Sequence, residues 1–507
     1  MTSRRQGRCS CKGGIEHLNL SKQDRIVHLL NRFGLGATET EVEHFTGIGV
    51  DGTIHDLIEY ETIPDTFSVS PARFFFRPNN TVDMDTSRVA LWWILRMATS
   101  PRPSQEKLAL FWHSHFAVSG SKVEFGPMML QYVNTLRDNA NGAFGDLLVR
   151  VSKTPAMLQW LDTDKSLPGH PNENFAREVM ELFTLGIGNY SENDIKESAR
   201  AYTGWSVRYP FYELQGMTTE DRARYTFGVA GPAVAFQDAP DLHDNGPKTF
   251  LGETAPMTAE DVLGKLASHE KTAENICRKM WEFYAYPNPD PKIVTRLAKR
   301  FIKSNGDIKQ VLYAIAGSRE FWSDQSVGNM VKSPVDFAIG ALRQVGGSEP
   351  LATLAAQPAT YDDPMDGYLE GQLYFLARNM ASQGLSVLYP PNVSGWKWDT
   401  AWATEGAFVD RSHFQDFAFA YGHNGIFPAR DLVQNIMTDH KDGTEAAIVD
   451  RLLGAMQLKM SPDKVAVLVD ACKRAGGAKS LTDLRKATAM AHQVVRFIYA
   501  SPEYQLC

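Results

Sequence analysis

Cysteine is scarce in this chain, and the few that occur are scattered. Only five are present, at positions 9, 11, 277, 472 and 507, which is too few and too dispersed for a disulfide framework. A chain of 507 residues that is 43% apolar can bury a large core without such cross-links. Cys9 and Cys11 form a lone C-x-C pair, which we interpret as part of a flexible polar tail and not as a metal site.

The chain also lacks an excess of positive charge and any long hydrophobic run. It has 52 Lys and Arg against 59 Asp and Glu, a formal net charge of −7, so no nucleic acid is expected as a partner. The apolar run that starts at Val89 is interrupted at Arg96, far short of the ~20 residues of a membrane helix, so no membrane span is expected. No apolar segment follows Arg4 and Arg5, so the sequence as given contains no signal peptide, and the localisation stays open.

Helical periodicity dominates the chain, and strand-like alternation is rare. We predict helices over residues 22–32, 39–44, 86–99, 104–116, 123–139, 144–152, 259–269, 273–284, 291–304, 308–316, 334–345 and 481–500. Pro, Gly and aromatic residues replace this pattern over 208–258, where the stretch 225–236 predicts a short hairpin. We therefore expect an all-α fold with a flexible tail, 1–19, and a single helical domain, 20–507. That domain has two candidate lobes, 20–207 and 259–507, joined by the irregular excursion 208–258.

The densest group of polar residues lies between positions 172 and 205. A helix starting near Asn172 is predicted first, and a second helix, 191–205, begins with a capping box of Ser191 and Asp194. Carboxylates suited to acid–base chemistry recur here: Glu173, Glu178, Glu181 and Asp194. Candidate substrate-binding groups accompany them: Asn172, Asn174, Arg177, Arg200 and Trp205. The alternative is an ion-pair network that joins two helices, because pairs spaced three or four residues apart are common on helices.

Three histidines add to this set. His113 and His115 stand two apart near a predicted helix end, and on a continuous helix they would point about 200° apart, so they share a site only if the helix stops there. Gly120 is consistent with such a stop. His243 lies with Asp244 and Lys248 in the excursion, and loops are where functional residues gather. Taken singly, each histidine also fits a hydrogen-bonded structural role.

Tryptophans concentrate near position 400. Trp396, Trp398 and Trp402 follow a Pro390-Pro391 pair that restricts the backbone. Aromatic faces of this kind can stack on a sugar ring, or they can pack in a core. Both interpretations stay open on the sequence.

Several of these segments together resemble the bacterial domain of unknown function 1800 family. They are residues 111–119, 172–186, 190–205, 243–252 and 390–396, and the resemblance extends from 28–34 through 155–162 to 500–504. It implies one helical unit without a settled activity. The family is often found on exported proteins, beside sulfatase-like proteins and in bacteria that process polysaccharides, so a sulfatase-like protein is a candidate partner. This chain departs from the family pattern in having Ser114 where Asn is common, and in lacking an export signal.

Three functions are compatible with these observations. The leading hypothesis is a carbohydrate-active enzyme, a hydrolase or lyase acting on a polysaccharide, with the carboxylates above as general acid and base, His113 or His115 assisting, and Trp396 and Trp402 binding sugar. The second is a hydrolase or redox enzyme with a divalent metal held by residues from His113, His115, Glu178, Glu181 and His243. The third is a non-catalytic cell-envelope or matrix protein whose polar network is structural.

Overall fold

The protein is mostly helical, with two small antiparallel sheets in the region described, as a computed structural model shows. The structure describes residues 20–75, 82–209, 215–216, 218, 234–356, 367–420, 427–440 and 443–507. The all-α prediction is confirmed. The predicted flexible tail, 1–19, and most of the predicted hairpin, 225–236, lie outside these residues. Within them, no helix combines the length and apolarity that a bilayer crossing requires.

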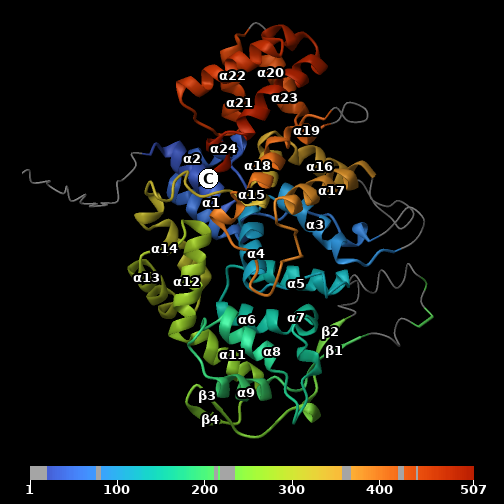
Figure 1. The fold of residues 1–507 in the computed structure, drawn as a ribbon, viewed down its shortest axis with the longest axis vertical. Coiled ribbons are helices and arrows are strands. Elements are labelled where there is room, and N and C mark those ends of the chain that lie inside the picture. The colour runs from blue at the N-terminus through green and yellow to red at the C-terminus, as the bar shows by residue number, and fades with distance from the viewer. Residues whose placement is uncertain are drawn as a thin grey trace, which may run out of the picture.

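The helices of the first 160 residues build much of the central part of the body (Figure 1). They are α1 (Lys22–Phe33), α2 (Glu39–Ile58), α3 (Thr86–Thr99), α4 (Pro103–His115), α5 (Gly126–Asp138), α6 (Phe144–Ser152) and α7 (Pro155–Trp160). Helices α1, α3, α4, α5 and α6 begin and end close to the predicted positions, whereas α2 continues well past its predicted end at residue 44 and α7 was not predicted. Every residue of α4 is buried, because α1, α3 and α5 all pack against it. The C-terminal end of α4 therefore lies inside the molecule.

The segment predicted as two long helices is broken in two places. The first helix, α8 (Glu173–Glu178), begins after an Asn172 cap and then widens into the π-helical turn Val179–Phe183. The second, α9 (Glu192–Ala201), has the predicted capping box of Ser191 and Asp194, but it ends four residues before Trp205. The predicted helical extent to Trp205 is therefore wrong: Gly204, at φ +89°, turns the chain, and Trp205 starts a strand.

The strands in the described part of the chain lie in the excursion and directly before it. Strand β1 (Trp205–Arg208) pairs with β2 (Ala235–Asp238), and β3 (Lys248–Phe250) forms a hairpin with β4 (Glu253–Ala255). β3 packs against α9, so the excursion is fixed to the helix that precedes it.

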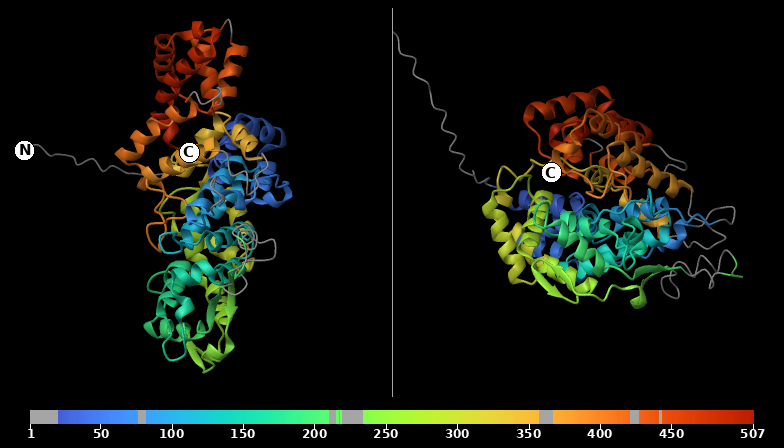
Figure 2. Two further views of the ribbon diagram at one scale, coloured as in Figure 1. Left: turned by 90° about the vertical axis from the view of Figure 1, so that its right-hand side faces the viewer. Right: turned by 60° about the horizontal axis from the view of Figure 1, so that its bottom comes forward.

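The second half of the chain continues as helices: α11 (Ala259–Ser268), α12 (Glu270–Tyr284), α13 (Pro291–Lys303), α14 (Ile308–Ala316), α15 (Pro334–Gln344), α16 (Ser348–Ala356), α17 (Gly367–Ser382), α18 (Glu405–Ser412), α19 (Gln415–Ala418), α20 (Arg430–Asp439), α21 (Glu445–Ala455), α22 (Pro462–Arg474), α23 (Leu484–Tyr499) and α24 (Pro502–Gln505). α11 packs on α6, while α15 and α17 pack on α3, so helices on either side of the excursion share contacts. Helices α20 to α23 form one end of the elongated body, as Figure 2 also shows.

Candidate functional site

The C-terminal end of α4 is covered by residues 388–402, which we call the tryptophan loop. The backbone N–H of Trp396 donates to Ser114 Oγ over 3.2 Å. Gly395, at φ +73°, lies so close to the Ser114 carbonyl oxygen that any Cβ at this position would collide with it. The loop is therefore seated on the residue that separates His113 from His115.

Helix α12 supplies the opposing polar groups. Lys279 Nζ lies 3.3 Å from His115 Nδ1 and donates to the Leu182 carbonyl over 2.9 Å. His115 Nε2 lies 3.1 Å from the Phe183 carbonyl oxygen, which can only accept, so Nε2 carries the hydrogen and Nδ1 accepts from Lys279. The imidazole is therefore neutral and held between two fixed partners.

These contacts explain the docking of the segment after Asn172. The last carbonyls of a helix have no partner within the helix. Here the carbonyls of Leu182, Phe183 and Thr184, at the end of the π-helical turn, accept from Lys279, His115 and Asn275 respectively. The π-helical turn thus connects the polar segment to both α4 and α12.

A cavity of about 290 Å³ opens between α4, α12 and the tryptophan loop, and we call it the α4–α12 pocket. Its volume is near the lower end, ~300 Å³, of pockets that bind small molecules. Its polar and aromatic lining includes His115, Lys279, Glu282, Trp396, Trp398 and Asp399. Two residues predicted from the sequence, His115 and Trp396, therefore meet in one pocket.

Burial changes the ionisation of the groups that line this pocket. It lowers the pKa of Lys279 from 10.5 to about 8, and it raises the pKa of the Glu282 carboxyl above its ordinary value. It also lowers the pKa of His115 well below 6.5, and the nearby charge of Lys279 acts in the same direction. Groups whose pKa values are displaced by burial around one cavity are candidates for acid–base chemistry.

His113 lies in the core and not in the pocket. Its side chain is fully buried, its Nδ1 lies 3.0 Å from Tyr132 Oη, and its ring packs edge-on against Trp396. Burial lowers its pKa to about 3, so the ring stays neutral. The structure therefore separates His113 from His115.

The carboxylates of the predicted segment lie outside the α4–α12 pocket. Glu181 Oε2 accepts from the Tyr190 hydroxyl over 2.6 Å, and Glu181 lines a second cavity of about 390 Å³ that Lys279 also borders. Burial, together with the charge of Glu181, raises the pKa of Glu178. Neither glutamate lines the α4–α12 pocket.

The remaining polar residues of this segment make local contacts. Arg177 donates to both carboxylate oxygens of Glu192 over 3.0 and 2.9 Å at the surface, with Glu173 at 3.9 Å. Asp194 caps α9 and accepts from the Leu251 N–H over 2.8 Å.

Asn172 and Asn174 form hydrogen bonds at the N-terminal end of α8. Asn172 Oδ1 accepts from the Asn174 N–H over 2.8 Å, and its amide donates to the Asp162 carbonyl over 2.7 Å. The Asn174 amide donates to the Leu161 carbonyl over 3.4 Å. Both side chains therefore satisfy nearby backbone groups.

The excursion residues form a separate cluster against α9. Arg200 pairs with Asp244 over 2.7 Å and holds the pKa of that carboxyl at about 2. Lys248 donates to the Asp244 carbonyl over 2.6 Å, and His243 Nδ1 donates to the Thr203 carbonyl over 2.9 Å.

Two of the predicted tryptophans are also placed by packing. Trp205 is buried and packs edge-on against Phe236 of β2. Trp402 is buried next to Trp398, with ring centroids 6.2 Å apart. Neither lines the α4–α12 pocket.

The predicted metal ligands do not converge. In the part of the chain that the structure describes, no three His, Cys, Asp or Glu side chains are placed to hold a metal ion together. His113, His115 and His243 each contact a different part of the molecule.

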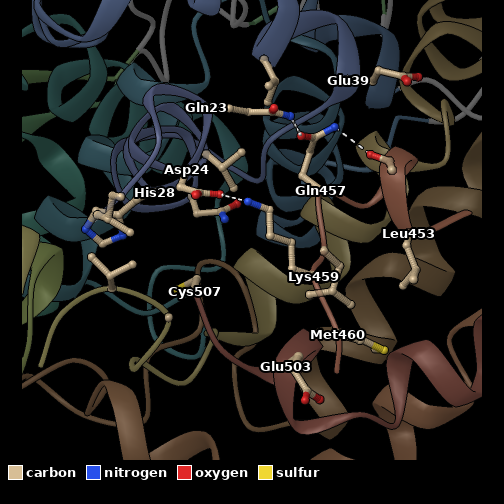
Figure 3. Close-up of a pocket in the computed structure, with 18 of the residues that line it drawn as sticks. Gln23, Asp24, His28, Glu39, Leu453, Gln457, Lys459, Met460, Glu503 and Cys507 are labelled. Carbon is tan, nitrogen blue, oxygen red and sulfur yellow. Dashed lines mark hydrogen bonds and ion pairs between the residues drawn. The ribbon is translucent and has the colours of Figure 1, made fainter. Parts of the chain in front are cut away.

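A larger cleft, about 1090 Å³, lies between α1, α2 and the C-terminal helices (Figure 3). Asp24 pairs there with Lys459 over 2.5 Å, and the amide of Gln23 donates to Gln457 over 3.4 Å. None of the predicted site residues lines it. The contacts across the cleft connect α1 to the segment after α21 and so have a structural role. Because the α4–α12 pocket contains predicted site residues and this cleft does not, we favour the smaller pocket as the chemical site.

Sequence reasoning missed Lys279, Glu282 and Asp399. One signal was present on α12: Lys279 falls among Ile276, Met280 and Phe283, which recur at helical spacing and are all buried. A lysine next to an apolar stripe marks an amine that folding will partly bury.

Comparison with known proteins gives a family and no activity. The family model described as "Protein of unknown function (DUF1800)" matches residues 28–506. No curated protein and no solved structure matches the chain. Because the match takes in nearly the whole sequence, the chain belongs to the DUF1800 family of proteins of unknown function.

Proposed function

We propose that the α4–α12 pocket is a catalytic site that cleaves a carbohydrate by general acid–base chemistry. One observation carries the proposal: a lysine and a glutamate whose pKa values burial displaces share one small cavity with an aromatic side chain, Trp398. Glycoside cleavage needs two carboxyl groups beside the scissile bond, and Glu282 and Asp399 both line this cavity.

Each group has a role that its surroundings support. Glu282 is the general acid, because burial raises the pKa of its carboxyl and favours the protonated form. Asp399 is the second carboxylate, and its orientation is fixed because its Oδ1 accepts from the Val331 N–H over 2.8 Å. Lys279 lines the same cavity, and its ammonium group can donate a hydrogen bond to a sugar hydroxyl.

Trp398 provides the binding face. Its ring is partly exposed and is held edge-on against Phe283, with ring centroids 4.7 Å apart. A sugar ring can stack on the face of an indole. The cavity volume of about 290 Å³ favours a site for one or two sugar rings of a polysaccharide, and a sulfatase-like partner would act on the same polymer.

The proposal is tested with the full chain and a panel of polysaccharides, by measuring the release of reducing ends. Glu282→Gln should lower kcat by about 100-fold or more, since general acid catalysis typically contributes 10²–10⁴-fold. Trp398→Ala should raise KM more than it lowers kcat. Glu274→Gln, on the same helix, is the control, because Glu274 pairs with Lys271 and does not line the pocket.

Three results would refute this assignment. One is the absence of both product release and saturable glycan binding across the panel. Another is an equal loss of activity in Glu274→Gln and Glu282→Gln. The third is full activity in Glu282→Gln.

A non-catalytic envelope or matrix protein is the second candidate, and one observation favours it. Lys279 and His115 both donate hydrogen bonds to backbone carbonyls of the π-helical turn, which is what a purely structural linkage requires. In that case Lys279→Met should lower the melting temperature, while Glu282→Gln and Trp398→Ala leave glycan binding and turnover at background.

A further inference from the structure

Helix α13 carries a stripe of positive charge. Its cationic residues are Lys292, Arg296, Lys299, Arg300 and Lys303. Steps of three and four residues place them along one face of the helix, over ~16 Å at 1.5 Å per residue. The opposite face, with Ile293, Leu297 and Phe301, is buried in the core.

This stripe borders an open groove of about 1030 Å³ between α13 and α14. Six cationic side chains line the groove, the five of α13 and Arg319, against one carboxylate, Glu320. Arg296 donates to both oxygens of Glu320 over 3.2 and 2.9 Å, and this contact lowers the pKa of Glu320. The single negative charge in the lining is therefore already neutralised.

Three lysines of the stripe have no carboxylate partner. Over the described ranges of the chain, no ion pair involves Lys292, Lys299 or Lys303, and all three are exposed. A concave surface lined by one sign of charge concentrates the field and attracts the opposite charge. The chain as a whole carries a net charge of −7, so the positive charge of this groove is not evident from the total.

The shape and lining of the groove select among anionic partners. A nucleic-acid duplex is wider than the ~8–10 Å that separates the axes of packed helices. Single-stranded nucleic acid is held by stacking on aromatic faces, and the groove lining contains only Tyr313, whose hydroxyl donates to Glu59 over 3.3 Å. A membrane surface helix inserts its apolar face, but the apolar face of α13 is buried.

We propose that this groove binds a single extended chain of an acidic polysaccharide through its sulfate or carboxylate groups. The binding surface is separate from the α4–α12 pocket, and its occupation does not depend on catalysis there. Lysine ammonium groups contact such anions as point charges, so affinity should depend on charge density and fall steeply with salt.

The test uses the full chain, with dextran sulfate as the probe and neutral dextran of the same length as the reference. We expect saturable binding of dextran sulfate at 50 mM NaCl, no binding of dextran, and a loss of affinity as salt rises. Lys292→Gln/Lys299→Gln/Lys303→Gln should weaken binding by about tenfold or more, since three charged contacts are removed. The matched control is Lys473→Gln/Lys479→Gln/Lys486→Gln, which removes the same charge from exposed lysines elsewhere, and it should stay within about twofold of the wild type.

Other anions provide the comparison. Single-stranded DNA, polyglutamate and phosphatidylglycerol vesicles are titrated at equal charge concentration, and tighter binding of any of them than of dextran sulfate overturns the proposal. So does an equal loss of affinity in the control variant, or no binding of dextran sulfate at all. If the triple variant does not fold, the single Lys299→Glu variant must weaken binding, and unchanged affinity there also overturns the proposal.

Discussion

Replacement of Lys279 by methionine should change how the stability of this protein depends on pH. Lys279 is partly buried between α12, His115 and the π-helical turn, and burial lowers its pKa from 10.5 to about 8. In the unfolded chain the amine keeps its ordinary pKa. Methionine preserves most of the side-chain length and removes the charge.

The sign and size of the effect follow from proton binding. Between pH 8 and 10.5 the unfolded chain keeps the Lys279 proton while the folded protein loses it, so the unfolded state binds more protons and stability rises with pH. Below pH 8 both states are protonated and this contribution is constant. The free energy of unfolding rises by about 1.4 kcal/mol per pH unit, and by at most about 3 kcal/mol between pH 8 and 10.5.

The assay is urea denaturation of the wild type and of Lys279→Met at several pH values from 7 to 10. The difference between their free energies of unfolding isolates Lys279 from the cysteines and tyrosines that also titrate at high pH. Lys271→Met on the same helix is the control. Its amine is exposed, and the hydrogen bond to Glu274 raises its pKa, so its difference curve should not rise with pH.

A flat difference curve for Lys279→Met between pH 8 and 10 would refute the reasoning. It would mean that water reaches the amine freely and that its pKa is ordinary. The proposed acid–base role of the α4–α12 pocket depends on the displaced pKa values of Lys279 and Glu282, and it would then lose the first of them.

Three further substitutions test the packing and capping elsewhere in the fold and the seating of the tryptophan loop. Glu106→Gln removes the carboxylate that the buried Arg96 and Arg137 share, so the free energy of unfolding in urea should fall by about 3–5 kcal/mol. A loss below about 1 kcal/mol would contradict a buried pairing. Gly395→Ala places a Cβ against the Ser114 carbonyl oxygen at a residue with positive φ. The free energy of unfolding should therefore fall by more than the about 1–2 kcal/mol that a left-handed backbone alone costs, and the tryptophan emission should shift. An unchanged emission spectrum would contradict the contact between the tryptophan loop and Ser114. Ser191→Ala breaks the capping box of α9 and should cost about 1 kcal/mol by thermal denaturation, whereas Ser191→Asp should retain most of the stability.

Helix positions could be read from the sequence because their signals are local. The predictions for 144–152 and 308–316 coincide with α6 and α14, and the capping box at Ser191 is present as expected. Apolar periodicity and caps act within one or two turns of the chain, so they need no knowledge of distant residues. Errors came where the backbone departs from the regular α-helix, at the π-helical turn Val179–Phe183 and at Gly204. The predicted end of the helix at residue 44 was also wrong, because α2 continues through a kink at Gly49 to Ile58.

The composition of the candidate site was decided only by the tertiary structure. His115 and Lys279 are 164 positions apart in the chain, and their contact depends on how α12 packs against the end of α4. His113 resembles His115 in the sequence, yet its side chain points into the core because two residues on a helix differ by about 200°. The cationic groove follows the same rule: a net charge of −7 is a property of the sequence, but which charges face a common groove is a property of the fold, because electrostatic fields add in space and not along the chain.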